Sequence, residues 1–317
     1  MELVIKPTFG CNFKCSFCSS ARKTKQILTL EQIEEVLKEN FVSTVIVNGG
    51  DPLMMPPSFY YDLRSLVDKY NKDCDISLTT NLWDWYKNPE KWTKTIQDCK
   101  LGICTSFQFG EGRITPENKT LDVETFEDIF YKFLDTFGYR LEFISVLTDE
   151  NDKYAIENVR LAQDLQTTCK LNGAFASGRQ SYLYSREKLY AIYLKLFENE
   201  LWEHENNCRN LLRFFKHENT ICPLSNQQCS KHIRCLSATG NLTNCPALED
   251  DDILDSTKFK VFKKECLTCK FFKICNGCMK QVKDLRNDKN GQLQDCSALF
   301  ETLQKIENFC TKCGGFD

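Results

Sequence analysis

The sequence predicts an α/β fold in which a partial (β/α)6 barrel is followed by a small cysteine-rich domain. Through the first two thirds of the chain, short apolar runs alternate with helical segments. The runs are β-branched, aromatic or small, and most are bounded by Gly, Asn, Asp or Pro, as buried parallel strands are. From about Asn207 the cysteines become dense and the helical segments short, which indicates a second domain organised by metal. Six alternations imply a parallel sheet with right-handed crossovers, curved into an incomplete, TIM-like barrel.

The first helix has the clearest start signal of the predicted elements. Thr29-Leu30-Glu31-Gln32 is a capping-box pattern, in which the Thr and Gln side chains each bind the other residue's backbone N–H. Leu30, Ile33 and Leu37 then fall on one apolar face. Strands are expected at Leu3–Lys6, Val42–Val47, Asp75–Thr80, Leu101–Phe107, Leu141–Leu147 and Leu171–Ala176. Further helices are expected at Ser58–Tyr70, Pro89–Cys99, Val123–Phe137, Asn151–Gln166 and Ser185–Trp202.

Composition narrows the class of protein. The chain has 317 residues, which suggests about two domains, and we expect these to span 1–206 and 207–317. A formal net charge of −3 gives no electrostatic case for binding nucleic acid. No segment resembles a membrane span or a secretory signal, so we expect a cytoplasmic protein that has no membrane partner. Nineteen cysteines, an odd number, then favour metal or cluster ligation over a disulfide framework.

Three cysteines near the start of the chain carry the strongest chemical signal. Cys11, Cys15 and Cys18 are spaced C-x₃-C-x₂-C and begin just after the first predicted strand. Three closely spaced thiolates can hold three irons of a [4Fe–4S] cluster, because soft sulfur ligands suit iron–sulfur chemistry. The fourth iron is then open to a substrate or cofactor. A zinc knuckle is the structural alternative, but no fourth ligand lies nearby in the sequence.

With Phe17 immediately before the third cysteine, this motif resembles that of the radical S-adenosylmethionine (SAM) superfamily. The resemblance implies that SAM binds the open iron through its amino and carboxylate groups. It also implies reductive cleavage of SAM to a 5′-deoxyadenosyl radical that abstracts hydrogen from a substrate. Further motifs follow in the family's order: Asn48-Gly49-Gly50-Asp51-Pro52 resembles its Gly-Gly-Glu-Pro turn, Thr79-Thr80-Asn81 ends the third predicted strand, and Gly178-Arg179 follows the sixth. The residues implied to contact SAM are Phe17, Gly49, Gly50, Asp51, Asn81 and Arg179.

Each of these motif residues also has a structural interpretation. Phe17 could be a core residue, and glycines commonly end strands. Asp51 stands where the family has Glu, which keeps the charge but shortens the reach. Asn81 and Arg179 could serve structural hydrogen bonds as readily as a cofactor, although Arg179 could hold a carboxylate bidentately.

The C-terminal cysteines resemble the SPASM domain of radical SAM enzymes that mature peptides and proteins. The resemblance implies two auxiliary [4Fe–4S] clusters, one held by Cys229, Cys235, Cys245 and Cys278 and the other by Cys266, Cys269, Cys275 and Cys296. Two structural Cys₄ zinc sites are the alternative. The spacing also lets Cys222 replace Cys229 or Cys235, and Cys310-x₂-Cys313 stays unassigned.

SPASM relatives tend to catalyse two-electron oxidations, because an auxiliary cluster can take the electron that the substrate radical loses. The resemblance therefore implies an oxidoreductase that crosslinks or dehydrogenates a peptide, such as a ribosomally made (RiPP) precursor. A small-molecule dehydrogenase acting on an aminocyclitol is an alternative, and an iron–sulfur electron-transfer or scaffold protein is a non-enzymatic one. The implied reductant is a flavodoxin or ferredoxin.

Sequence reasoning leaves the catalytic base and the site of substrate recognition open. Sulfatase-maturing relatives have an Asp where this chain has Pro246, which counts against the same chemistry. The three histidines are candidate bases only by elimination. Because the chain begins directly at the barrel, recognition of a leader peptide is expected at the barrel mouth, in the C-terminal domain or on a separate leader-peptide-binding protein. The histidines are His204, His217 and His232, and the aromatic residues that could line a cleft are Trp83, Trp85 and Tyr86.

Overall fold

The structure is a computed structural model of the chain, and it describes residues 1–21, 25–218, 232–243, 268–275 and 296–312. One sheet of eight strands runs through it in the order β6-β5-β4-β3-β2-β1-β7-β8. Neighbouring strands from β5 through β7 in this order pair in parallel, whereas β8 pairs antiparallel to β7. The predicted parallel α/β sheet of a partial barrel is thus confirmed. The strands are β1 (Glu2–Lys6), β2 (Thr44–Val47), β3 (Asp75–Thr79), β4 (Leu101–Ser106), β5 (Glu142–Leu147), β6 (Cys169–Gly173), β7 (Ile233–Ser237) and β8 (Leu242–Thr243).

Two of these strands, β7 and β8, are absent from the sequence prediction. β7 pairs along the whole of β1, with Glu2 opposite Ile233 and Lys6 opposite Ser237. β8 has only two residues, so its apolar pattern is too short to be recognised. The first strand is therefore an interior strand, with β2 on one side and β7 on the other.

The helices begin close to their predicted starts. The Thr29 capping box is confirmed, since the Gln32 N–H donates to Thr29 Oγ1 at 3.4 Å and the Thr29 N–H donates to Gln32 Oε1 at 3.0 Å. The helix expected at 151–166 is a 3₁₀ turn followed by an α-helix. The α-helices are α1 (Leu30–Glu39), α2 (Pro57–Tyr70), α3 (Trp83–Lys87), α4 (Pro89–Asp98), α5 (Val123–Phe137), α6 (Ala155–Asp164), α7 (Arg186–Glu198), α8 (Asn206–Phe215), α10 (Phe272–Cys275) and α12 (Ser297–Lys312). The 3₁₀ turns are η1 (Pro52–Met54), η2 (Asp152–Tyr154) and η3 (Trp202–His204).

Contacts divide the chain into two compact units. The first contains 1–144, 177–179 and 231–253, and the second contains 145–176, 180–230 and 254–317. The strands β7 and β8 thus belong with the N-terminal strands. The boundary expected between 206 and 207 from the cysteine density stays a prediction.

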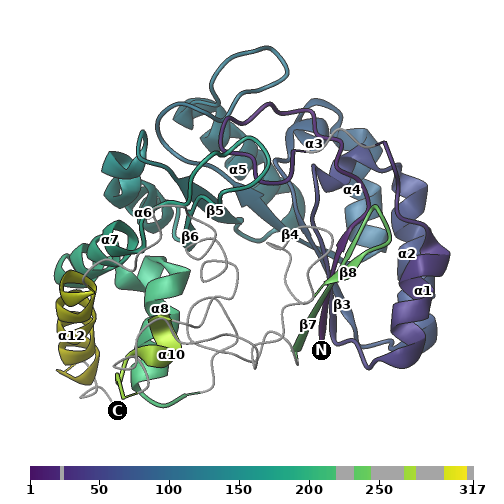
Figure 1. Cartoon of the computed structure of the whole chain (residues 1–317). Coiled ribbons are helices and arrows are strands. Elements are labelled where there is room, and N and C mark those ends of the chain that lie inside the picture. The colour runs from purple at the N-terminus through teal and green to yellow at the C-terminus, as the bar shows by residue number, and fades with distance from the viewer. Residues whose placement is uncertain (22–24, 219–231, 244–267, 276–295, 313–317) are drawn as a thin grey trace. The chain divides into compact units, whose positions relative to one another are not determined.

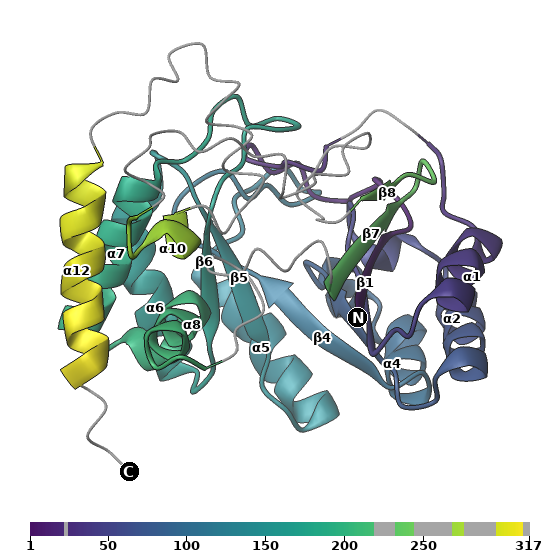
Figure 2. The ribbon, with the colours of Figure 1, turned by 60° about the horizontal axis from the view of Figure 1, so that its bottom comes forward.

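The core of the first unit lies between its strands and the helices that cover them. The helices α1, α2 and α4 pack along one side of β1–β3 (Figures 1 and 2). Aromatic rings fill the space under α5, where Phe107 stacks on Phe126 with ring centroids 4.4 Å apart. Trp85 packs edge-on against Phe133 at 5.4 Å. Burying a side chain of this size contributes roughly 1.5–3 kcal/mol, so this layer stabilises the frame that carries the candidate site.

The second unit is a helical layer around β6. The helix α12 lies along α7 and also contacts α8, with Leu303, Ile306 and Cys310 buried (Figure 2). At the start of α8 the carboxylate of Glu205 is fully buried. Its oxygens accept the N–H of Leu171 at 2.9 Å and the N–H of Cys208 at 2.6 Å, which caps the helix and ties it to β6.

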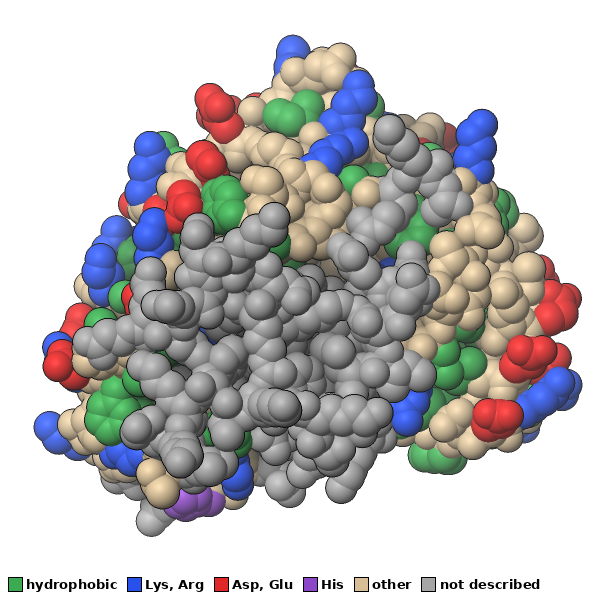
Figure 3. Space-filling view, viewed as in Figure 1, with side chains coloured by type: hydrophobic (Ala, Val, Ile, Leu, Met, Phe, Trp, Pro, Cys, Tyr) green, Lys and Arg blue, Asp and Glu red, His purple; other side chains and the backbone are tan. Residues whose placement is uncertain are grey.

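Two properties of the described surface bear on partners. No described helix is long and apolar enough to cross a membrane. Acidic and basic side chains are interspersed over the coloured parts of the face in Figure 3. This mixture of signs agrees with the nearly balanced composition.

The pKa of Glu205 generates a prediction about stability. Burial raises this pKa from 4.5 to about 7, although the two N–H donors favour the ionised form. The folded protein therefore holds a proton there that the unfolded chain has lost, and its stability falls as pH rises from about 4.5 to about 7. In Glu205→Gln this pH-dependent loss is absent. Urea unfolding followed by circular dichroism at about pH 5 and about pH 8 should show the wild type losing about 2–3 kcal/mol relative to the variant.

The matched control is Glu187→Gln, which changes an exposed carboxylate in the first turn of α7. Its stability should follow the wild type at both pH values. A wild-type loss no larger than that of Glu205→Gln would show that Glu205 stays ionised throughout this range.

Candidate functional site

The loop that carries the first three cysteines follows β1 and is held by backbone hydrogen bonds. The Lys14 N–H donates to Ile114 O at 2.9 Å, and the Ser16 N–H donates to Gly112 O at 2.8 Å. Residues 112–114 come after β4, so the loop pairs with a segment about a hundred residues further on. We call residues 11–18 the cysteine loop.

The Gly49–Gly50 turn after β2 packs against the backbone that leads into the cysteine loop. The Gly50 N–H donates to Thr8 O at 2.9 Å, and the Asp51 N–H donates to Gly10 O at 2.8 Å. A Cβ on Gly50 would lie 2.0 Å from Gly10 O, and one on Gly49, whose φ is +125°, would lie 2.3 Å from Thr8 O. Both positions therefore need glycine because another stretch of backbone passes so close.

The Asp51 carboxylate is buried and faces the end of β3. Its oxygens accept the Thr80 hydroxyl at 2.9 and 3.0 Å, the Asn81 N–H at 2.8 Å and the Leu53 N–H at 2.9 Å. Burial raises the pKa of Asp51, and these donors oppose the rise by binding the carboxylate. In this structure the side chain ties the turn after β2 to the turn after β3, and a contact with SAM stays a prediction.

Asn81 connects the end of β3 to the cysteine loop. Its Nδ2 donates to Asn12 Oδ1 at 2.7 Å and lies 3.8 Å from Cys11 Sγ, while its Oδ1 accepts the Trp83 N–H at 2.9 Å. Trp83 in turn packs edge-on against Phe13 of the loop, at 5.6 Å between ring centroids. Asn81 therefore lies against a cluster-ligand candidate from which it is far removed in sequence.

The Gly178–Arg179 pair binds the backbone at the other end of the cysteine loop. The Arg179 N–H donates to Cys18 O at 2.9 Å, and its Nη1 donates to Cys15 O at 3.1 Å. Gly178 has φ +65°, and a Cβ there would lie 2.3 Å from Cys18 O. The exposed Arg179 side chain thus positions the loop in this structure.

Arg113 completes the site, and sequence reasoning missed it. The guanidinium is buried and lies 5.4 Å from the centroid of the Phe17 ring. Gly112 allows this packing, because a Cβ there would be 2.6 Å from Ser16 Oγ and 3.3 Å from the Phe17 ring. A lone arginine in a loop forms no pattern of its own, so only the fold reveals that it lies here.

The electrostatics of the cysteines disfavour thiolates without a compensating cation. Loss of hydration, together with the charge of Asp51, raises the pKa of Cys11 to about 12. Loss of hydration also raises the pKa of Cys15, and Arg113 opposes that rise. A coordinated metal supplies the missing positive charge and deprotonates the thiols it binds.

The cysteine loop supplies the soft thiolate donors that a [4Fe–4S] cluster uses. Within the described residues, no three His, Cys, Asp or Glu side chains are grouped as ligands of one ion. A cubane cluster instead takes each thiolate on a different iron, so its ligands need not converge on one point. The buried Nε of Arg113 has no hydrogen-bond partner in the described structure, so one donor of this guanidinium is not used there.

The structure describes only part of the expected auxiliary ligand set. Cys235 is buried on β7 opposite Val4, Cys275 ends α10, Cys269 is partly exposed, and Cys296 is exposed just before α12. The remaining cysteines of interest lie outside the described residues: Cys222, Cys229, Cys245, Cys266, Cys278 and Cys313.

Other residues considered from the sequence have structural contacts here. Trp83 and Trp85 are buried, which favours packing over a cleft lining. His204 Nδ1 lies 3.0 Å from Thr167 O. Cys310 is buried on α12. His217 lies just beyond α8 with a left-handed φ of +60°, and His232 is exposed immediately before β7.

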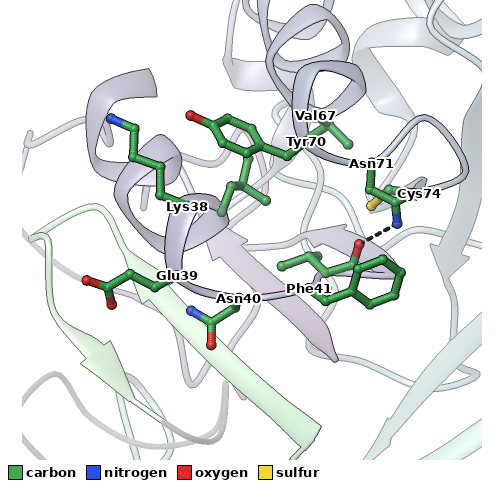
Figure 4. Close-up of a pocket in the computed structure, with 10 residues that line it drawn as sticks. Lys38, Glu39, Asn40, Phe41, Val67, Tyr70, Asn71 and Cys74 are labelled. Carbon is green, nitrogen blue, oxygen red and sulfur yellow. Dashed lines mark hydrogen bonds between the residues drawn. The ribbon is translucent and has the colours of Figure 1, made fainter.

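A separate cavity of about 330 Å³ lies between the C-terminal ends of α1 and α2 (Figure 4). Its lining includes Phe41, Val42, Tyr70, Asn71 and Cys74, and Asn71 Nδ2 donates to Val42 O at 2.9 Å. These residues precede β2 and β3, whereas the cysteine loop and the Gly49–Gly50 turn follow β1 and β2. The cavity therefore lies at the N-terminal ends of these parallel strands, whereas the candidate site lies at their C-terminal ends.

Comparison with known proteins agrees with this geometry. Residues 5–162 match the radical SAM superfamily, and the chain belongs to that superfamily. Its fold resembles native anSMEcpe with bound AdoMet, at 18% identity and a TM-score of 0.69 over 98% of this chain and 97% of that one. It also resembles Streptococcus suis SuiB bound to the precursor peptide SuiA, at 18% identity and a TM-score of 0.61 over 94% and 75% of the two chains.

A relative found by sequence is an uncharacterized protein of Methanothermobacter thermautotrophicus. It is 26% identical over 90 residues, which is 26% of this chain and 34% of that protein. The chain thus matches about a third of this relative's length, and the match carries no activity with it.

The close approach at Gly50 predicts that a single methyl group disrupts the site. In Gly50→Ala the new Cβ meets backbone atoms of Gly10 at 2.0 Å, so the segment leading into Cys11 must shift. We expect a loss of about 1–3 kcal/mol of stability and incomplete cluster incorporation. Melting temperature and iron content after anaerobic reconstitution would measure both.

Gly102→Ala on β4 is the control, since its Cβ would meet only ordinary contacts at 3.5 Å or more. It should retain iron at the wild-type level. Full iron content and unchanged stability in Gly50→Ala would contradict the close packing described above.

Proposed function

We propose that this protein is a radical SAM enzyme that oxidatively modifies a peptide, by crosslinking or dehydrogenation of a precursor made on the ribosome. The observation that carries the proposal is the support of the cysteine loop. Segments after β3 and β4, together with the Gly178–Arg179 pair, bind it directly, and the turn after β2 binds residues 8 and 10, which lead into it. Such support is expected of a loop that must hold a reactive cluster in one geometry.

Within this proposal, Cys11, Cys15 and Cys18 hold three irons and leave the fourth open. When bound, the cluster supplies an electron that cleaves SAM and yields a 5′-deoxyadenosyl radical for hydrogen abstraction. The chain's own residues orient the cofactor: Asn81 and Asp51 fix the edge of the site at β3, and Arg179 fixes the backbone at Cys15 and Cys18. The remaining implied SAM contacts are Phe17, Gly49 and Gly50.

The C-terminal cysteines are proposed to form a SPASM-type domain with two auxiliary [4Fe–4S] clusters. Their role would be to accept the electron that the substrate radical loses, which makes the overall reaction a two-electron oxidation. A flavodoxin or ferredoxin in the cytoplasm would reduce the SAM-binding cluster. The support for this arrangement is the cysteine spacing, since half of its ligands lie outside the described residues.

A peptide substrate is supported by the structures that share the fold. They include anSMEcpe with AdoMet and a Kp18Cys peptide, at 17% identity and a TM-score of 0.70, and SuiB with its precursor peptide SuiA. At identities this low, the similarity establishes a shared fold but does not establish a shared activity. The reaction, its target residue and any separate leader-peptide-binding protein are therefore parts of the proposal.

Iron analysis of wild type and of the Cys11/Cys15/Cys18→Ala triple variant tests the proposal. After anaerobic reconstitution we expect about twelve irons in the wild type and about eight in the variant, because only one of three clusters is lost. The dithionite-reduced wild type should release 5′-deoxyadenosine from SAM, and the variant should not. About four irons together with bound zinc would instead make the C-terminal sites structural, and SAM cleavage by the triple variant would refute the assignment of the cysteine loop.

A further inference from the structure

Arg113 is a buried cation that faces the three cysteines from outside their motif. Only 5% of the residue is exposed. The three cysteines favour its charged form, against the effect of burial on its pKa. The backbone on either side of it, at Gly112 and Ile114, is the part that pairs with the cysteine loop. The guanidinium is therefore fixed relative to the sulfur atoms by the same contacts that hold the loop.

The groups that hold the guanidinium are neutral. Nη1 donates to Ser106 Oγ at 2.8 Å, and Nη2 donates to Gln108 Oε1 at 3.0 Å. The Phe17 ring covers one side at 5.4 Å. These partners fix the orientation of Arg113 without cancelling its charge, and burial limits screening by salt. Burial lowers the pKa of Arg113, and the nearby cysteines oppose that fall.

A fixed positive charge has a defined effect on a redox centre. Each electron added to a cluster makes it more negative, so a nearby cation stabilises the reduced state more than the oxidised state. Cluster potentials are known to respond to charge, to hydrogen bonds at sulfur and to exposure. Asn81 is a neutral donor near Cys11 Sγ, whereas Arg113 is a cation fixed against the cysteine loop through Phe17 and through the backbone of residues 112 and 114.

We propose that Arg113 raises the reduction potential of the cluster held by Cys11, Cys15 and Cys18, and so sets how readily the cluster accepts its electron. This inference rests on the proposed function, because it requires a cluster at the cysteine loop. It makes Arg113 a positioned charge rather than a catalytic residue. Its effect should be present before SAM binds.

The test is an anaerobic redox titration, without SAM, of wild type, Arg113→Gln and Arg113→Lys, followed by electron paramagnetic resonance. The signal missing from the Cys11/Cys15/Cys18→Ala variant identifies the cluster of interest. In Arg113→Gln we expect the equilibrium constant for reduction to fall about tenfold, which is ~59 mV for a one-electron couple. Arg113→Lys keeps the charge and should recover most of this shift.

Arg64→Gln is the matched control. Arg64 is also largely buried, but its partners are Cys74 O and Asp68. Its loss should leave the midpoint unchanged. An unchanged midpoint in Arg113→Gln at full iron content would overturn the proposal, and so would an equal shift in the Gln and Lys variants.

Loss of the cluster in a variant also decides the question. If Arg113→Gln loses iron while Arg113→Lys keeps it, the charge is needed to hold the cluster, which supports the proposal. If both lose iron equally, the guanidinium acts through its shape and hydrogen bonds, which overturns it. Failure of the proposed function gives a different result. The Cys11/Cys15/Cys18→Ala variant would then show the same electron paramagnetic resonance signals as the wild type.

Discussion

The site depends on the binding of one loop's backbone by the rest of the first unit. The cysteine loop has no regular secondary structure, so its N–H and C=O groups must find partners elsewhere. Lys14 and Ser16 donate to the segment after β4, while the carbonyls of Cys15 and Cys18 accept bonds from Arg179. The sulfur atoms are thus positioned largely by contacts of the loop's backbone, with additional donors at Cys11 Sγ from the Phe13 N–H and Asn81.

Further hydrogen bonds hold those supporting segments in fixed positions relative to one another. The Asp51 carboxylate binds Thr80 and Asn81, so the turns after β2 and β3 form a single unit. Asn81 connects this unit to the cysteine loop, because its side-chain amide contacts Asn12 and Cys11. Such a network is costly to break, because a carboxylate at 2% exposure would lose its donors without gaining water.

Much of this arrangement could be predicted from the sequence, because it depends on local patterns. The six N-terminal strands and the Thr29 capping box come from periodicity and short-range chemistry. The Cys11–Cys18 spacing and the Gly49–Gly50 turn form recognisable motifs. The remaining features depend on distant parts of the chain. Arg113 forms no motif, the inward orientation of Asp51 depends on Thr80, and β7 is recognised as a strand only through its pairing with β1.

The pairing of β1 with β7 also bears on how the chain is made. β1 begins at Glu2 and its partner β7 begins at Ile233, so the chain between them is synthesised before the two strands can pair. Until that partner has been synthesised, one edge of β1 exposes unpaired backbone groups beside the apolar residues Leu3, Val4 and Ile5. The strand that leads into the cysteine loop is therefore synthesised well before its pairing with β7 can be completed.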